Sequence, residues 1–374
     1  MKNSKQLILT LIILLTVTAS IAQQIVGYAP YYRSYASTFD FSKYTHVHYF
    51  AIWPAADGSF IYPQGQDSLS MLAQYNSIAS KAQPQGVKMV ITFGGTSANG
   101  SKHFPEMAQD PVARAAFVSN AIELCNTWNI DGIDVDWEWE AHEESTEHKD
   151  AYTALLTDLR VVTTSAGLSL STDVPASSWF GANSDADAVG LCDYVNVMSY
   201  EYNGSWAPSA KHHSPLSSTI SLGLNYWEGR GISRGKLNIG IPFYSYLYSG
   251  TTTPGSVYTD VTKLNYAQVK ALILSGYTVV EDNNAGTYCY SVADNKIVFY
   301  DSPTNINNKF SYAKNNNYSG VIIWEIGQDD NQELSSALTS VLSVSSEINK
   351  KDNFVLFQKD TELIIQVPGG SFEA

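Results

Sequence analysis

The chain has 374 residues, of which 44% are hydrophobic and 16% charged, and this is the composition of a globular protein with enough length for a large core. Its formal net charge of −14 at pH 7 argues against nucleic acid and anionic membrane surfaces as partners, because both require basic patches. A neutral polymer remains open as a ligand, since its binding does not depend on net charge.

The first 22 residues have the pattern of a secretory signal peptide. Lys2 and Lys5 form a short basic region, residues 7–19 are apolar, and residues 20–22 (SIA) resemble a small-x-small cleavage site. The apolar stretch is short for a helix that spans a bilayer, which disfavours the alternative of an uncleaved membrane anchor. We therefore expect cleavage near Ala22 and a soluble product that is exported, either secreted or periplasmic.

Eight β-type runs alternate with helix-like patterns along the rest of the chain. The runs are residues 24–28, 45–52, 87–93, 132–138, 168–174, 194–200, 237–243 and 320–325, and the helical patterns are about 66–84, 110–129, 146–166, 214–230 and 304–317. Such an alternation predicts an α/β fold, the (β/α)8 TIM barrel, over residues 23–345.

Two segments depart from this rhythm. Residues 245–300 are rich in Tyr, Thr, Gly and Asn with short β-like pieces, and they predict a small insertion between strands seven and eight. Residues 346–374 form a C-terminal extension in which a polar link precedes FVLF and ELIIQV, which alternate like strands. The extension could be a strand pair, the stub of a β-module or a sorting tail.

The three cysteines, Cys125, Cys192 and Cys289, form an odd and sparse set whose spacing matches no metal motif. We expect buried thiols, with one disulfide at most.

Residues 131–140 read DGIDVDWEWE, which places five carboxylates among the apolar residues of a buried strand. Because strand side chains alternate between two faces, Asp134, Asp136 and Glu138 share one face, and Asp131 lies at the beginning of the strand. Glu138 falls at the strand's C-terminal end, where the active sites of TIM barrels form.

Crowding of like charges raises the pKa of some of these carboxyls. Asp134 and Asp136 could share a proton, and Glu138 at the rim would hold its proton near neutral pH and act as a general acid. A Ca²⁺ or Mg²⁺ site and a solvated acidic edge remain open alternatives. The stiff strand disfavours the metal and the interleaved Ile, Val and Trp disfavour the edge, so catalysis is favoured.

The run DGIDVDWE resembles the DGxDxDxE signature of the family 18 glycoside hydrolases, the chitinases and their relatives. Four further strand ends carry segments similar to that family: Thr92–Gly95 (TFGG), Met198–Glu201 (MSYE), Gly240–Tyr244 (GIPFY) and Gly320–Trp324 (GVIIW). The resemblance covers residues 24–340. It implies a TIM barrel whose insertion matches the α+β insertion of the subgroup with a deep cleft, and a hydrolase that cleaves β-1,4 bonds of N-acetylglucosamine polymers.

The resemblance also implies a retaining, substrate-assisted mechanism. Glu138 would protonate the glycosidic oxygen, and the 2-acetamido carbonyl of the sugar in the −1 subsite would attack C1 to give an oxazolinium ion. Asp136 would turn toward Glu138 and bind the acetamido N–H, and Asp134 would exchange a proton or hydrogen bond with Asp136. Tyr200 would donate its hydroxyl to the acetamido oxygen.

The substrate-binding residues implied by the resemblance lie mainly at strand ends. Trp324 would form the floor of the −1 subsite. The other candidates are Tyr28, Phe50, Gly95, Trp139, Met198 and Glu201, with Trp53, Trp179 and Trp206 for further subsites. Packing in the core or on the surface is the alternative role for these aromatic side chains. Glu201 stands where the family has Asp, and Thr92 where it has Ser.

Three other functions share part of this evidence: an endo-β-N-acetylglucosaminidase acting on N-glycans, a non-catalytic chitin-binding protein similar to a lectin, and a metal-dependent hydrolase. The favoured partner is chitin or a chito-oligosaccharide. We expect no cofactor, no metal, no nucleic acid, no membrane association after signal cleavage, and a monomer.

Overall fold

The computed structural model describes residues 23–96, 99–138, 146–282 and 286–341, together with strands at 355–359, 362–367 and 370–372. The predicted signal peptide and the candidate residue Trp139 lie outside the described residues. Within them, no helix combines the length and the apolar character needed to cross a bilayer.

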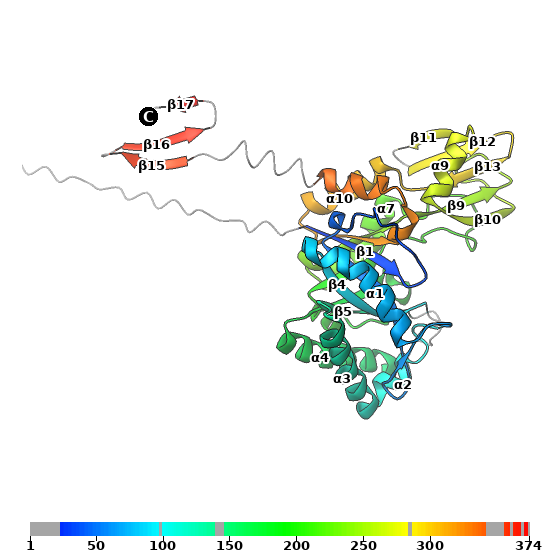
Figure 1. Ribbon diagram of the computed structural model, residues 1–374. Helices are drawn as coiled ribbons and strands as arrows, with labels where there is room; N and C mark the ends of the chain where they lie inside the picture. Colours follow the sequence, from blue (N-terminus) through cyan, green and yellow to red (C-terminus); the bar gives the residue numbers. More distant parts are fainter. Residues whose placement is uncertain are drawn as a thin grey trace, which may run out of the picture.

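Eight parallel strands close into a barrel, which confirms the predicted fold (Figure 1). They are β1 (Gln24–Pro30), β2 (His46–Pro54), β4 (Lys88–Gly95), β5 (Gly132–Trp137), β6 (Ser169–Pro175), β7 (Tyr194–Met198), β8 (Leu237–Pro242) and β14 (Gly320–Trp324). Neighbouring strands follow the order of the chain, and β1 pairs with both β14 and β2, so the sheet has closed. The short β3 (Phe60–Ile61) extends β2 as an antiparallel hairpin.

Four long helices lie within one or two residues of the predicted ranges: α1 (Ser68–Ala82), α3 (Pro111–Trp128), α4 (Thr146–Ala166) and α10 (Pro303–Asn315). Their starts follow from local chemistry. Asp67 and Ser302 form capping boxes with the third residue of α1 and α10, and Asp110 caps α3 ahead of Pro111.

The helix predicted at 214–230 is present over residues 216–229, but its middle is π-helical, which was not predicted. It runs without a break through α7 (Leu216–Ser218), a π-helical turn (Thr219–Leu224) and α8 (Asn225–Gly229). Gly223 lies close enough to the barrel that an added Cβ would stand 3.1 Å from the Tyr202 hydroxyl. A π-helical turn is wider than an α-helical one, which fits the close approach of Gly223 to the barrel. The spacing of apolar residues does not predict this approach.

Several short elements were not predicted. They are α2 (Phe104–Gln109), α5 (Ser178–Gly181), α6 (Ala186–Gly190), a helical stretch over residues 333–341, and 3-10 turns at Phe41–Lys43, Gln83–Gln85, Arg234–Lys236 and Ile326–Gln328.

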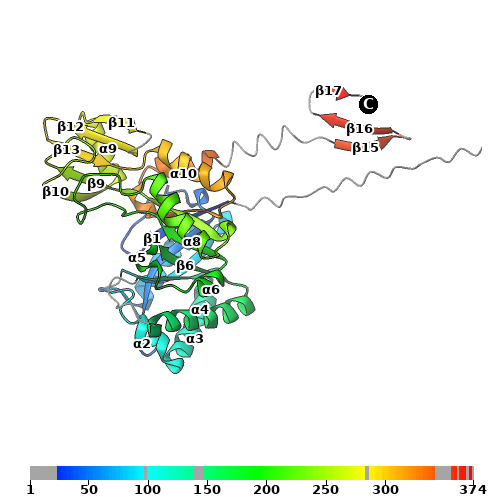
Figure 2. The same cartoon turned by 180° about the vertical axis from the view of Figure 1, so that it is seen from behind.

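The insertion between barrel strands seven and eight is present as predicted. It comprises β9 (Tyr244–Ser249), β10 (Asp260–Asn265), α9 (Tyr266–Leu274), β11 (Thr278–Asp282), β12 (Gly286–Ser291) and β13 (Lys296–Phe299). Its five strands form an antiparallel sheet in the order β10-β9-β13-β12-β11. In Figures 1 and 2 this lobe, in yellow-green to yellow, stands beside the barrel.

Three further strands, β15 (Val355–Lys359), β16 (Glu362–Val367) and β17 (Gly370–Phe372), pair antiparallel with one another in the C-terminal extension. Whether they belong to a larger β-module stays an open prediction.

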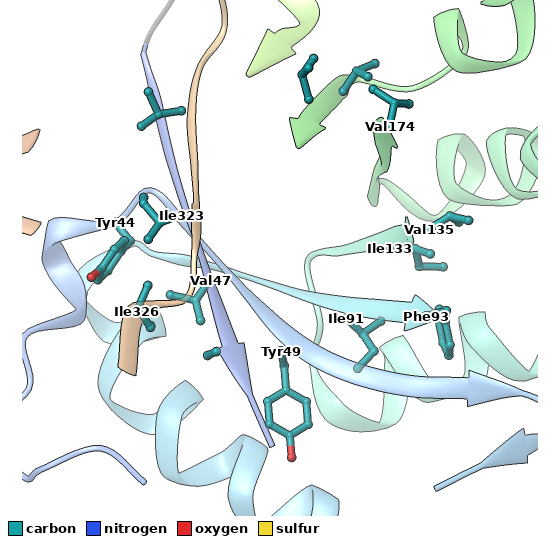
Figure 3. Packing of buried hydrophobic residues seen from close by; sticks show 14 of the residues in the cluster. Tyr44, Val47, Tyr49, Ile91, Phe93, Ile133, Val135, Val174, Ile323 and Ile326 are labelled. Carbon is teal, nitrogen blue, oxygen red and sulfur yellow. The ribbon is translucent and has the colours of Figure 1, made fainter. Parts of the chain in front are cut away.

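The main hydrophobic core fills the layer between the barrel strands and the helices (Figure 3). The pairs Val47 and Tyr49, Ile91 and Phe93, and Ile133 and Val135 face that layer and are fully buried. Residues that alternate with them, such as His48, Thr92 and Asp134, therefore face the barrel interior. Period-two alternation thus leaves an apolar outer face and a polar inner one. The three cysteines are buried and free, consistent with the expected thiols.

A buried ion pair joins α10 to the segment between β13 and α10, and a hydrogen bond from the same lysine reaches the loop that follows β7. Lys309 Nζ lies 2.5 Å from Asp301 Oδ2 and donates to the Ser214 hydroxyl at 2.8 Å, and both charged side chains are almost fully buried. Removing one partner of a buried pair leaves the other charge uncompensated, which costs about 3–5 kcal/mol.

We therefore expect Lys309→Ala to lower the free energy of unfolding by about 3–5 kcal/mol. The matched control is Lys270→Ala, which breaks an exposed pair with Glu333 and should cost less than about 1 kcal/mol. Urea unfolding of both variants gives the two values. Equal losses would contradict the importance of burial at this pair.

Candidate active site

A cavity of about 560 Å³ opens at the C-terminal ends of the barrel strands, where active sites of this fold form. Its volume is usual for a small-molecule site. The predicted site residues that line it are Tyr28, Phe50, Asp136, Glu138, Met198, Tyr200, Glu201 and Trp324. The structure therefore brings the predicted acid, its partner Asp136 and the predicted sugar-binding rings around one space.

Asp134 lies beneath this cavity, fully buried, and accepts hydrogen bonds from several strands. Ser171 Oγ donates to Oδ1 at 2.5 Å, and Thr92 Oγ1 donates to Oδ2 at 3.0 Å. Nδ1 of His48 lies 3.2 Å from Oδ2, and its Nε2 lies 3.0 Å from the Tyr194 hydroxyl. Burial alone would raise the pKa of Asp134, but His48 and these hydrogen bonds hold it below the usual value.

Asp173 on β6 is a second buried carboxyl that was not predicted from the sequence. It lines the cavity, only 5% exposed, and the Tyr28 hydroxyl lies 2.7 and 2.8 Å from its two oxygens. Burial, followed by the charges of Asp134 and Asp136, raises its pKa well above the usual range. Asp173 lies two residues after Ser171 and therefore on the same strand face, so strand alternation could have predicted its inward orientation.

The ends of β4 and β5 are held together at the acidic motif. Ser101 Oγ lies 2.7 Å from the Gly95 carbonyl oxygen and 3.1 Å from that of Asp136, and the Glu138 backbone N–H donates to it at 2.8 Å. A Cβ on Gly94 would stand 2.0 Å from the Asp136 carbonyl oxygen, and one on Gly95 would stand 2.6 Å from the Phe50 ring. The paired glycines, both at positive φ, therefore permit the close approach that places Glu138 at the rim.

Three aromatic rings form one side of the cavity. The Trp324 ring centre lies 4.7 Å from that of Phe50 and 5.7 Å from that of Tyr28. Trp179 and Trp206 also line the cavity and are 70% and 56% exposed, so they present open faces near its mouth. Trp53 lies in the hairpin of β2 with β3 and is not among the lining residues.

Tyr200 and Glu201 follow β7 and lie against the insertion. Burial, followed by the charges of Asp173 and Asp136, raises the pKa of Tyr200 well above its usual value, so its hydroxyl keeps its proton. Glu201 Oε1 accepts from the hydroxyls of Tyr244 and Tyr246, each at 3.0 Å, and from Lys263 Nζ at 2.7 Å. Its carboxylate therefore ties the barrel mouth to two strands of the insertion, a link not predicted from the sequence.

Asp131 lies at the opposite end of β5, away from the cavity. Its Oδ2 accepts from the Met89 backbone N–H and its Oδ1 from Lys88 Nζ, both at 2.9 Å. These bonds pair the start of β5 with the start of β4, which is a structural role.

No group of three or more His, Cys, Asp or Glu side chains in the described part of the chain is arranged to hold a metal ion. Around Asp134, the hydroxyls of Thr92 and Ser171 donate hydrogen bonds to the carboxylate.

Residues 24–329 match the family described as Glycosyl hydrolases family 18, which is most of the chain. This chain belongs to that family. The resemblance of the acidic motif to the family signature is thereby confirmed at the level of the whole barrel.

Curated relatives carry chitinase names. Chitinase A1 of Niallia circulans is 25% identical over 309 residues, which cover 71% of this chain and 44% of that protein. A class V chitinase of Lotus japonicus is 26% identical over 332 residues, which cover 80% of this chain and 81% of that protein. A probable endochitinase of Caenorhabditis elegans is 29% identical over 277 residues, which cover 65% of this chain. The chain spans 44% of the Niallia and the Caenorhabditis proteins, so it is similar to one part of each.

Solved structures share the fold. The Group IV chitinase of Ostrinia furnacalis has a TM-score of 0.75 at 24% identity, over 86% of this chain and all of that chain. A chitinase of Cycas revoluta in complex with (GlcNAc)4 has a TM-score of 0.77 at 22% identity, over 85% of this chain and 99% of that chain.

Proposed function

We propose that this protein hydrolyses β-1,4 bonds between N-acetylglucosamine units by a retaining, substrate-assisted mechanism. The observation that carries the proposal is the cavity at which Glu138, Asp136 and Tyr200 meet the ring of Trp324. Membership of family 18 supports it, as do the chitinase relatives and the (GlcNAc)4 bound by the similar Cycas structure.

The first step needs a proton donor at the bond to be broken. Glu138 at the rim donates its proton to the glycosidic oxygen as the bond from that oxygen to C1 breaks. The acetamido carbonyl oxygen of the same sugar forms a bond to C1, giving the oxazolinium ion. Tyr200, which keeps its proton, donates a hydrogen bond to the acetamido group and orients it for attack.

The positive charge of the intermediate lies on the acetamido nitrogen. Asp136, on the same strand face as Glu138, accepts the N–H and offsets this charge. Water then attacks C1 from the face that the leaving group left as the bond from C1 to the acetamido oxygen breaks, and the Glu138 carboxylate takes the proton of the water. Two inversions at C1 give net retention.

Substitution of Glu138 tests its role as the general acid. Glu138→Gln cannot donate the proton, and we expect kcat on chitotetraose to fall at least about 10³-fold while binding of the oligosaccharide persists. Glu123→Gln, an exposed residue of α3, is the control and should match the unchanged protein. Turnover of the Glu138 variant within about tenfold of the unchanged enzyme would remove Glu138 from the role of acid.

The substrate supplies the nucleophile in this mechanism, so its acetyl group is required. A partly de-acetylated oligomer should be cut only at bonds whose −1 sugar carries the N-acetyl group. Mass spectrometry of the products identifies that sugar. Efficient cleavage after a glucosamine unit would contradict substrate assistance. Comparing glycan release from a glycoprotein with cleavage of chitotetraose separates this function from an endo-β-N-acetylglucosaminidase.

We further propose that the protein is exported by the N-terminal signal and acts as a monomer. The support for export is the basic, apolar and small-residue order of residues 1–22. Intact mass and N-terminal sequencing of the protein recovered outside the cytoplasm should show a chain beginning near residue 23. Recovery of the uncut chain in a membrane fraction would favour an anchor.

A further inference from the structure

Asp173 is a carboxyl that the proposed mechanism does not use, although it lines the same cavity. It lies on the inner face of β6, next to the strand that carries the acidic motif. The register pairs Asp134 with Ser171, so Asp173 stands one inward position closer to the cavity than Ser171 does. It therefore belongs to the layer of Asp136.

The hydrogen bonds around Tyr28 require an additional proton in this cluster. The Tyr28 hydroxyl accepts from Asn196 Nδ2 at 2.9 Å and lies 2.7 Å and 2.8 Å from the Asp173 oxygens and 3.1 Å from Asp134 Oδ2. A phenol has one proton to donate. Two ionised carboxylates around that single donor would leave oxygen lone pairs facing each other without a proton in between, so one carboxyl of the pair is protonated.

The surroundings of Asp134 and Asp173 decide which of the two carboxyls carries the additional proton. Asp134 accepts from Ser171 and Thr92 and lies against His48, and all three favour its ionised form. Asp173 faces the negative charges of Asp134 and Asp136, which favour its neutral form.

We propose that Asp173 is a neutral carboxylic acid that holds the proton of the cluster and positions Tyr28 and Asp134. This inference rests on the proposed function: a neutral Asp173 places no additional negative charge beside Asp136, the residue that would bind the acetamido N–H. Asp173 is thus a positioning residue, and no bond to the substrate is assigned to it.

Stability as a function of pH tests the protonation without any activity assay. An unfolded Asp ionises near pH 4, whereas a neutral Asp173 keeps its proton on folding, so the native state binds one more proton. The unchanged protein therefore loses stability as the pH rises from about 5 toward the pKa of Asp173 in the native state. Asp173→Asn, which cannot ionise, lacks this loss.

We expect the folding equilibrium constant of Asp173→Asn, relative to that of the unchanged protein, to rise about tenfold per pH unit between pH 5 and 7. Asp260→Asn, at an exposed position on β10, is the control and should show a flat ratio. The groups that interact electrostatically with Asp173 are Tyr28, Asp134, Asp136, Tyr152, Tyr194 and Tyr200, with His48 beyond Asp134, and all are retained in both variants. A ratio that stays flat or falls with pH for Asp173→Asn would overturn the proposal.

Kinetics test the positioning role. Asp173→Ala removes the donor and should lower kcat on chitotetraose about tenfold or more, and Asp173→Asn, whose amide still donates, should recover most of that loss. The acid limb of the pH–rate profile should stay in place in Asp173→Asn. If it moves by about one pH unit to lower values, Asp173 is ionised in the working enzyme and the proposal is wrong. Absence of all hydrolysis in the unchanged protein would overturn the proposed function alone, because the stability test is independent.

Discussion

The active site depends on an ionised carboxyl, Asp134, buried inside the barrel and away from bulk water. A carboxylate there is stable only if donors replace its hydration. Asp134 obtains these donors from the two neighbouring strands and from across the barrel, because Thr92 and Ser171 lie on β4 and β6 and Tyr28 lies on β1. Closure of the sheet is what brings β1 beside this group, since an open sheet of the same strands would leave its edges apart. An ionised Asp134 at this position therefore requires a closed barrel.

The insertion contributes to the site more directly than its distance along the chain suggests. Glu201 takes hydrogen bonds from Tyr244 and Tyr246 on β9 and from Lys263 on β10, and Lys263 itself lines the cavity. The Glu201 side chain is longer by one methylene than the Asp that the family resemblance leads one to expect. Its carboxylate reaches both β9 and β10, so the residue after Tyr200 is hydrogen-bonded to the strands of the insertion that line the cavity.

Much of the fold and of the site could be predicted from the sequence, because the alternation of strand side chains between two faces depends only on local sequence. The parity that sends Val135 to the helix layer also sends Asp134 and Asp136 inward, and the family signature places Glu138 at the rim. The π-helical turn around Gly223 could not be predicted, since the close approach of Gly223 to Tyr202 depends on the fold and not on the local sequence. Asp173 has the correct parity but stands alone in SLSTDVP, and only the hydroxyl of Tyr28, far away in sequence, identifies its importance.

The position of the proton differs from what the acidic motif alone suggests. By the motif, Asp134 and Asp136 would share it, whereas in the folded chain the donors around Asp134 favour its anion and the shared hydroxyl of Tyr28 joins it to Asp173. A carboxyl kept neutral by burial lowers stability at neutral pH, because the unfolded chain would ionise it freely. An alanine or serine at this position would carry no such cost. The presence of Asp173 therefore fits a group retained for the electrostatics of the cavity, where a neutral acid adds no further negative charge beside Asp136.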